Sequence, residues 1–121
     1  MYELIVEADF AAAHSLRGYQ GECENLHGHN WKVQVMLKAE ALDGLGMVMD
    51  FKEIKRTLGE ILEGLDHKHL NELALFKKEN PTTENVSRIL YHELSKRLPQ
   101  RVSVSKVTTW ESACCGASYF Q

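Results

Sequence analysis

Two stretches of the chain alternate between apolar and polar positions, which predicts two half-buried β-strands. In residues 2–14 the apolar face is formed by Leu4, Val6, Ala8, Phe10 and Ala12. In residues 29–40 it is formed by Trp31, Val33, Val35, Leu37 and Ala39. Because successive side chains on a strand point to opposite faces, each stretch is expected to lay one face on a core and the other toward solvent.

Further along the chain, the spacing of apolar residues becomes helical. After the glycine turn DGLG, the apolar positions are Phe51, Ile54, Leu58, Ile61, Leu62 and Leu65. Asp50 followed by Glu53 resembles a capping box at the start of this helix. A second helix is predicted to begin at NPTTEN and to end before Pro99. Its apolar residues are Val86, Ile89, Leu90 and Leu94.

The order of these elements indicates the fold class. Residues 101–120 return to a strand-like composition, so the order is strand, strand, helix, helix, strand, strand. Strands grouped on either side of a helical pair favour an α+β domain with an antiparallel four-stranded sheet, covered on one face by both helices. We expect residues 1–121 to form one such domain, since a chain of this length can bury a sizeable core.

Composition and charge narrow the possible partners and the compartment. The net charge of −3 gives no indication of a nucleic-acid or membrane surface, and no apolar run is long enough to span a bilayer. The segment MYELIVEADF lacks the regions of a signal peptide. Three cysteines include the adjacent Cys114 and Cys115, which we interpret as small core residues because they have no metal or imidazoles beside them. Neighbouring cysteines bridge only with strain, and the third would have no partner. A reducing cytoplasm is expected.

The stretch CENLHGHNW, residues 23–31, carries candidate metal ligands. His27 and His29 can face one ion if the stretch is extended. His14 has the parity of the apolar face of the first strand, so the three imidazoles converge if the two strands pair as a hairpin. Three histidines with an open fourth position is a catalytic zinc arrangement. Two alternatives remain: ordinary histidines, or Cys23 as a fourth ligand that closes a structural site.

Several further residues have both a functional and a structural reading. Asp66 and His67, adjacent in LDHKHL, could relay a proton, or could be a solvated acid and a histidine at a helix end. Glu111, after the last long strand, could hold a cationic or guanidine-like group, or could be solvated. Glu84 is equally explained as an acid in the first turn of a helix. A thiol beside a metal and imidazoles, as at Cys23, would be a usable base near neutral pH.

Taken together, these motifs resemble one enzyme family. AAHSL, CENLHGHNW, GMVMDF, LDHKHL, PTTENV and TTWES, from about residue 5 to the C-terminus, resemble the 6-pyruvoyl-tetrahydropterin synthases, a family that includes the bacterial 6-carboxy-tetrahydropterin synthases of queuosine biosynthesis. The resemblance implies the β-β-α-α-β-β unit of the tunnelling fold. It also implies a homohexamer of two stacked trimers, with active sites between subunits.

The resemblance also implies roles for individual residues. Zinc would be bound by His14, His27 and His29, which leaves Cys23 outside the ligand set as the general base. Proton transfer would be assisted by Asp66 and His67. The guanidine-like edge of the pterin would be held by Glu111, helped by Thr82, Thr83 and Glu84. Zinc would acidify the side-chain hydroxyls of 7,8-dihydroneopterin triphosphate. The expected products are 6-carboxy-5,6,7,8-tetrahydropterin, acetaldehyde and triphosphate.

The choice of branch depends on the residues before the HGH motif. The short gap between Cys23 and HGH resembles the 6-carboxy enzymes rather than the 6-pyruvoyl branch. Glu24, however, lies three residues before HGH, as in a branch that cleaves dihydroneopterin to 6-hydroxymethyl-dihydropterin for folate synthesis. Glu24 is therefore a possible second base, or a solvated loop acid. If the protein is not an enzyme, the alternative is a non-catalytic, zinc-stabilised pterin-binding module.

Overall fold

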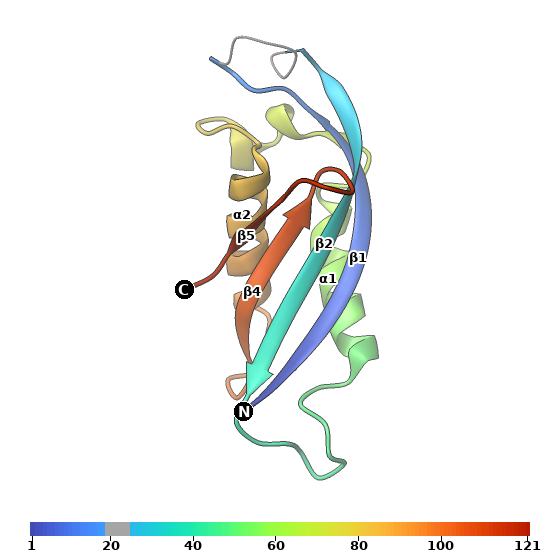
Figure 1. The fold of residues 1–121 in the computed structure, drawn as a ribbon, viewed down its shortest axis with the longest axis vertical. Helices are drawn as coiled ribbons and strands as arrows, with labels where there is room; N and C mark the ends of the chain where they lie inside the picture. Colours follow the sequence, from blue (N-terminus) through green and yellow to red (C-terminus); the bar gives the residue numbers. More distant parts are fainter. Residues whose placement is uncertain (19–24) are drawn as a thin grey trace.

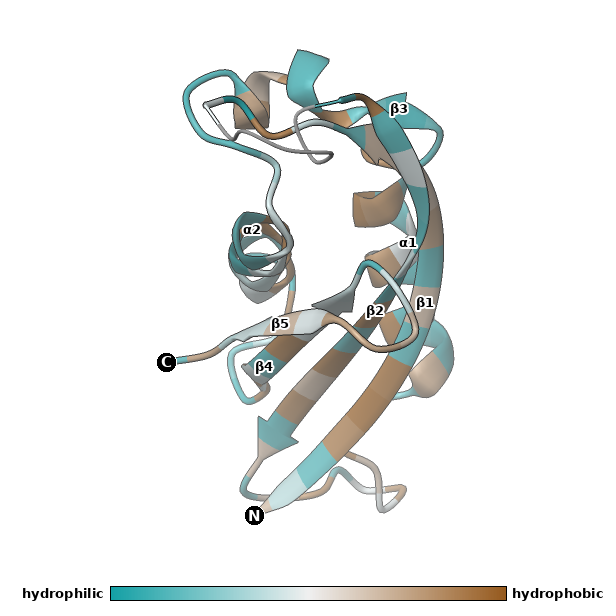
Figure 2. Cartoon of the chain, turned by 45° about the horizontal axis from the view of Figure 1, so that its top comes forward, coloured by the Kyte–Doolittle hydropathy of each residue, from teal (hydrophilic) through white to brown (hydrophobic). Residues whose placement is uncertain are grey.

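The computed structural model describes residues 1–18 and 25–121, and its centre is a long antiparallel pair of strands (Figure 1). Strand β1 (Tyr2–His14) pairs along its whole length with β2 (His27–Ala39). Burial alternates along both strands with the parity predicted from the sequence. Figure 2 shows the resulting bands of hydrophobic and hydrophilic residues.

Both helices lie on the face of the sheet that carries the apolar positions. Helix α1 (Phe51–Glu63) packs against β1, and α2 (Thr83–Ser95) packs against the C-terminal strands and against α1. The carboxylate of Asp50 caps α1 by accepting a hydrogen bond from the Lys52 amide, so the predicted start is confirmed. No described helix is long and apolar enough to cross a bilayer.

The sheet has five strands rather than the predicted four, in the order β3-β1-β2-β4-β5. The two strands expected in residues 101–120 are present as β4 (Ser103–Trp110) and β5 (Gly116–Tyr119), which form a hairpin. The additional strand β3 (Lys68–His69) is two residues long and pairs parallel with the end of β1. Two short 3-10 helices, η2 (Leu70–Glu72) and η3 (Ala74–Phe76), follow it. The α+β architecture of the tunnelling fold is otherwise as expected.

The core fills the layer between the sheet and the helices, and two predictions about it are wrong. Trp31, Leu58 and Leu90 are among the fully buried side chains. Phe51, assigned to the buried face of the first helix, is 51% exposed because it is the first residue of that helix. Cys114 and Cys115 are exposed, not small core residues, because they lie in the turn between β4 and β5.

Candidate active site

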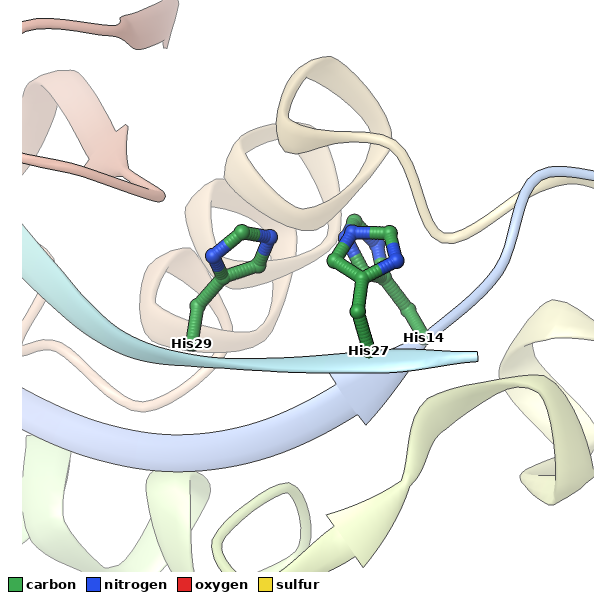
Figure 3. Close-up of side chains that lie close together, drawn as sticks. All are labelled: His14, His27 and His29. Atoms are coloured by element: carbon green, nitrogen blue, oxygen red, sulfur yellow. The ribbon is translucent and has the colours of Figure 1, made fainter. Parts of the chain in front are cut away.

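Strand register brings three histidines together at one end of the β1–β2 pair. His14 lies opposite His27, and His29 lies opposite Ala12 on the same face of the sheet. One ligand nitrogen from each imidazole lies within 4.8 Å of those of the other two. Figure 3 shows the three rings turned toward one another above the two strands. The predicted convergence of His14, His27 and His29 is confirmed.

Two backbone carbonyls orient the rings. His14 Nδ1 lies 2.8 Å from the carbonyl oxygen of Pro81, and His27 Nδ1 lies 2.7 Å from that of Asn25. Because a carbonyl oxygen only accepts, each Nδ1 carries the proton and donates it. The lone pair of each Nε2 is therefore free for a metal ion. The sequence gives no signal for either carbonyl, since every residue has one.

Burial favours the neutral form of two of these imidazoles. The side chain of His14 is 3% exposed, and burial lowers its pKa below 6.5; nearby His27 and His29 lower it further, against the Pro81 carbonyl and Glu111. The pKa of His29 is also lowered, again mainly by burial. Among the described residues, Nε2 of His14 and of His29 have no hydrogen-bond partner although they are buried. Buried nitrogens without partners are rare, and here they fit a bound metal ion.

A small cavity joins the histidines to residues distant in sequence. Its volume is about 170 Å³, and its lining is formed by His14, Leu16, His27, Thr82, Thr83, Glu84 and Glu111. The Oε2 atom of Glu111 accepts a hydrogen bond of 3.2 Å from the Thr83 hydroxyl. The same oxygen lies 3.9 Å from His14 Nε2 and 3.8 Å from His29 Nε2. The four residues predicted to contact substrate thus share one cavity with two of the metal-ligand candidates.

Residues at the start of α2 also stabilise the helix itself. The Thr82 hydroxyl caps the helix by accepting from the Asn85 amide at 3.1 Å. Glu84 lies in the first turn, where an acidic side chain is stabilised by the helix dipole. Thr83 is the residue whose hydroxyl is directed to Glu111. Its bond holds the carboxylate in the cavity.

Asp66 and His67 form a pair at a second depression. The Asp66 carboxylate accepts from the Ala11 amide at 2.9 Å and lies 3.0 Å from His67 Nδ1. The Ala11 amide is the main cause of a lowered pKa at Asp66, and His67 lowers it further. His67, 81% exposed, lines a depression of about 550 Å³ that also contains His29. The described lining of the Glu111 cavity does not include this pair.

Sequence reasoning missed two asparagines that fix the chain after β1. Asn71 bonds both backbone groups of Ser15, accepting from its amide at 2.9 Å and donating to its carbonyl at 2.8 Å. Asn80 does the same at Arg17, at 2.8 and 3.0 Å. An amide side chain copies the peptide's donor and acceptor, but the sequence does not reveal which asparagines find such a partner. Cys23 and Glu24 lie outside the described residues.

Comparison with known proteins adds independent information. The profile of the family described as 6-pyruvoyl tetrahydropterin synthase matches residues 3–121. The chain is 35% identical to a 6-carboxy-5,6,7,8-tetrahydropterin synthase of Synechocystis, covering 99% of this chain and 94% of the relative. It is 34% identical to a dihydroneopterin monophosphate aldolase of Pyrococcus furiosus, covering 89% and 88%. A solved 6-pyruvoyl tetrahydropterin synthase of Caenorhabditis elegans superposes with a TM-score of 0.88 at 27% identity, over 99% and 95% of the two chains.

Proposed function

Because the chain belongs to the 6-pyruvoyl tetrahydropterin synthase family, we propose that it is a zinc-dependent lyase of the 6-carboxytetrahydropterin synthase type. The substrate would be 7,8-dihydroneopterin triphosphate. With uptake of one water, it would give 6-carboxy-5,6,7,8-tetrahydropterin, acetaldehyde and triphosphate. The observation that carries this proposal is the cavity in which Glu111 and Thr83 face the histidine cluster. The 35% identical synthase of Synechocystis supports the choice of product.

The three histidines would hold the ion. Neutral imidazole is a preferred zinc ligand, and the lowered pKa values of His14 and His29 favour the neutral form near pH 7. Bound there, zinc would supply a Lewis acid that acidifies a hydroxyl of the substrate side chain. The three ligands would be neutral and would not themselves offset the charge of the ion, which strengthens that effect.

Glu111 would position the pterin. The guanidine-like edge of the ring presents N–H groups side by side, and a carboxylate accepts two such donors in a charge-assisted pair. The Thr83 hydroxyl fixes the carboxylate of Glu111 through Oε2, so the orientation is set before substrate binds. The adjacent Thr82 and Glu84 would complete the wall of the cavity.

Proton transfer would use Cys23 together with Asp66 and His67. Asp66 holds Nδ1 of His67, which leaves Nε2 of this exposed ring free to exchange a proton. Cys23 would act as the base on the substrate side chain, since a thiol near a cation and imidazoles ionises readily. The family resemblance assigns this role to Cys23.

A second candidate function is aldol-type cleavage of dihydroneopterin or its phosphates to 6-hydroxymethyl-dihydropterin. Two observations favour it: the 34% identical aldolase of Pyrococcus furiosus, and Glu24 directly after Cys23. Formation of 6-pyruvoyl-tetrahydropterin remains a third outcome, because a relative from Dictyostelium discoideum with 34% identity bears that activity in its name.

Product analysis tests these candidates directly. Zinc-loaded protein would be incubated separately with dihydroneopterin, its monophosphate and its triphosphate, and the pterins identified by mass spectrometry. We expect 6-carboxy-tetrahydropterin and one equivalent of acetaldehyde from the triphosphate. A hydroxymethyl product from the monophosphate alone would replace the synthase assignment by the aldolase one. Absence of turnover with all three substrates would favour a pterin-binding module.

Variants at Cys23 and Glu24 test which residue is the base in each reaction. Cys23→Ala should retain zinc and lose roughly 10²- to 10⁴-fold in turnover of the triphosphate, the range for a removed acid–base group. Glu24→Ala should leave that reaction within about tenfold, under 1.4 kcal/mol of barrier, but abolish hydroxymethyl formation. Loss of zinc in Cys23→Ala would show a closed four-ligand site. Loss of the triphosphate reaction in Glu24→Ala would transfer the role of base to Glu24.

The homohexamer implied by the family resemblance belongs to the same proposal. Beyond its contact with β3, β1 has no described strand on its outer edge, and β5 forms the opposite edge of the sheet. Unpaired edges favour association with further strands. Sedimentation velocity is expected to show a hexamer; a monomer at micromolar concentration would contradict it.

A further inference from the structure

Cys114 and Cys115 are two exposed thiols that the proposed reaction does not use. They lie in the turn between β4 and β5, and both are free. The Glu111 amide donates to the Cys115 carbonyl at 3.1 Å and closes this turn. Gly116, next in the chain, packs so tightly on the indole of Trp110 that an added Cβ would lie 2.7 Å from the ring. The two thiols are therefore held on a constrained turn.

The spacing of the two sulfurs decides what they can do. Their Sγ atoms are 3.9 Å apart. A disulfide needs about 2.05 Å between sulfurs and Cα atoms at least about 4.4 Å apart, whereas adjacent Cα atoms are only about 3.8 Å apart. Two thiolates on one tetrahedral ion, each at about 2.3 Å from it, are separated by about 3.8 Å. The observed spacing matches the ion rather than the disulfide.

We propose that Cys114 and Cys115 form a second metal-binding site, which takes one thiophilic divalent cation of the zinc and cadmium class. Each thiol would lose its proton to solvent as its sulfur–metal bond forms, so binding releases two protons and involves no change of oxidation state. Water would fill the remaining positions, because both thiols are exposed. The Ser112 hydroxyl lies 3.8 Å from Cys114 Sγ. It is not counted in the ligand set, because a neutral hydroxyl is a weak ligand for a soft cation.

The two sites would then select different ions. Thiolates prefer soft cations, whereas the imidazoles of the histidine cluster suit borderline ions such as zinc. Cadmium should therefore bind first at the cysteine pair and leave the histidine cluster available. This site does not depend on the proposed pterin chemistry, so it can be tested without any substrate.

Cadmium titration in a chosen background tests the proposal. The chain has three cysteines, so Cys23→Ser leaves Cys114 and Cys115 as its only thiols. The reduced variant would be titrated with Cd²⁺ while the ultraviolet sulfur-to-cadmium charge-transfer absorbance is recorded. We expect saturation at one thiolate-bound Cd²⁺ per chain. Adding Cys114→Ser or Cys115→Ser should weaken that binding at least about 100-fold, the lower end of the gain from linking two binding groups.

Controls make the result decisive. Ser112→Ala in the same background should bind within about twofold of its parent, since it removes a neighbour but no thiolate. If either single-cysteine variant binds Cd²⁺ as tightly as the pair, the thiols act independently and the site is wrong. An equal loss in Ser112→Ala would refute the two-thiolate ligand set. The proposal would also be wrong if protein purified in air has no free thiols at these positions and is lighter by two hydrogens, because the pair would then form a disulfide.

Discussion

Removing the metal tests whether the proposed ion is catalytic or structural. From the structure we predict that the metal-free protein stays folded. The three candidate ligands lie at one end of the β1–β2 pair. The apolar core, which includes Trp31, Ile54 and Phe76, lies between the sheet and the helices. His14 is buried beside Trp31, but none of the apolar core side chains is a candidate ligand. Each large apolar side chain that is buried contributes about 1.5–3 kcal/mol. The fold should therefore survive without the ion.

The ion should still raise stability by mass action. At free zinc about 100 times the dissociation constant, the gain is about 2.7 kcal/mol if unfolded chains do not bind zinc. For a domain of this size, 1 kcal/mol shifts the melting temperature by roughly 3–5 °C, which predicts a rise of about 10 °C. Among the described residues, Nε2 of His14 and of His29 is buried without a hydrogen-bond partner, and each would gain the ion as a partner. That gain is already contained in the dissociation constant.

Thermal unfolding followed by far-ultraviolet circular dichroism measures this shift. The protein would be melted after chelation and after reloading with zinc, alongside His27→Ala and the matched variant His92→Ala on α2. His27→Ala should melt cooperatively but lose the zinc-dependent rise, whereas His92→Ala should keep it. A chelated wild type without a cooperative transition would make the zinc structural. A full zinc-dependent rise in His27→Ala would remove His27 from the ligands.

Three further outcomes follow from the contacts described. Glu111→Gln should keep zinc but raise KM about 10- to 100-fold, because a hydrogen bond to a charged group is worth about 1.5–3 kcal/mol; unchanged kinetics would remove Glu111 from the pocket. Gly116→Ala should lower the free energy of unfolding in urea by about 1–3 kcal/mol, since its methyl carbon would lie 2.7 Å from the neighbouring indole. Gly59→Ala in α1, where the methyl group meets open space, should instead raise it by about 0.5–1 kcal/mol. Protonation of His14 and of His29 should weaken zinc binding only below pH 6.5, because the pKa of each is lowered and neutral imidazoles bind metal; in chelator competition, a decline that begins above pH 7 would contradict this.

The same lowered pKa values set the acid sensitivity of the metal-free protein. His14 and His29 bind a proton less readily when folded than when unfolded, where the pKa is about 6.5. Their contribution to stability is therefore complete above about pH 6.5 and is lost as the pH falls toward the folded pKa. Asp66 has its effect at lower pH. Because its pKa is lowered from about 3.8, the ionised carboxylate stabilises the fold above about pH 3.8, and this contribution is lost as the pH falls below that value.

The sequence predicted the histidine cluster well because strand parity is a property of the backbone. Once β1 and β2 pair, the side on which His14 and His29 emerge follows from the apolar residues beside them. The two-residue strand β3 could not be predicted in this way. Its pairing depends on contacts of Asp66 and His67 with Ala11, 55 or more residues away in the chain. A two-residue segment has no periodicity.

The wrong predictions share a physical cause. Residue type was taken as evidence of burial for Phe51, Cys114 and Cys115, although each lies at an end or a turn. A helix presents its apolar face to the core only where the helix is covered, and the first residue of α1 lies at the margin. A free cysteine behaves as a small hydrophobe, but Cys114 and Cys115 lie in the turn between β4 and β5, outside the layer that the helices cover.

The residues at the start of α2 had a structural and a functional interpretation that the sequence could not separate, and the contacts of this segment explain why. The Pro81 carbonyl orients His14, the Thr82 hydroxyl caps the helix, and the Thr83 hydroxyl holds Glu111. Three consecutive residues therefore connect the histidine cluster, the start of a helix and the proposed pterin anchor. Because the backbone carries the first contact and two side chains carry the others, a substitution at Thr82 should act through helix stability. One at Thr83 should act through the carboxylate. The structural interpretation is confirmed by the Thr82 cap, whereas the functional interpretation stays a prediction that rests on other atoms of the same segment.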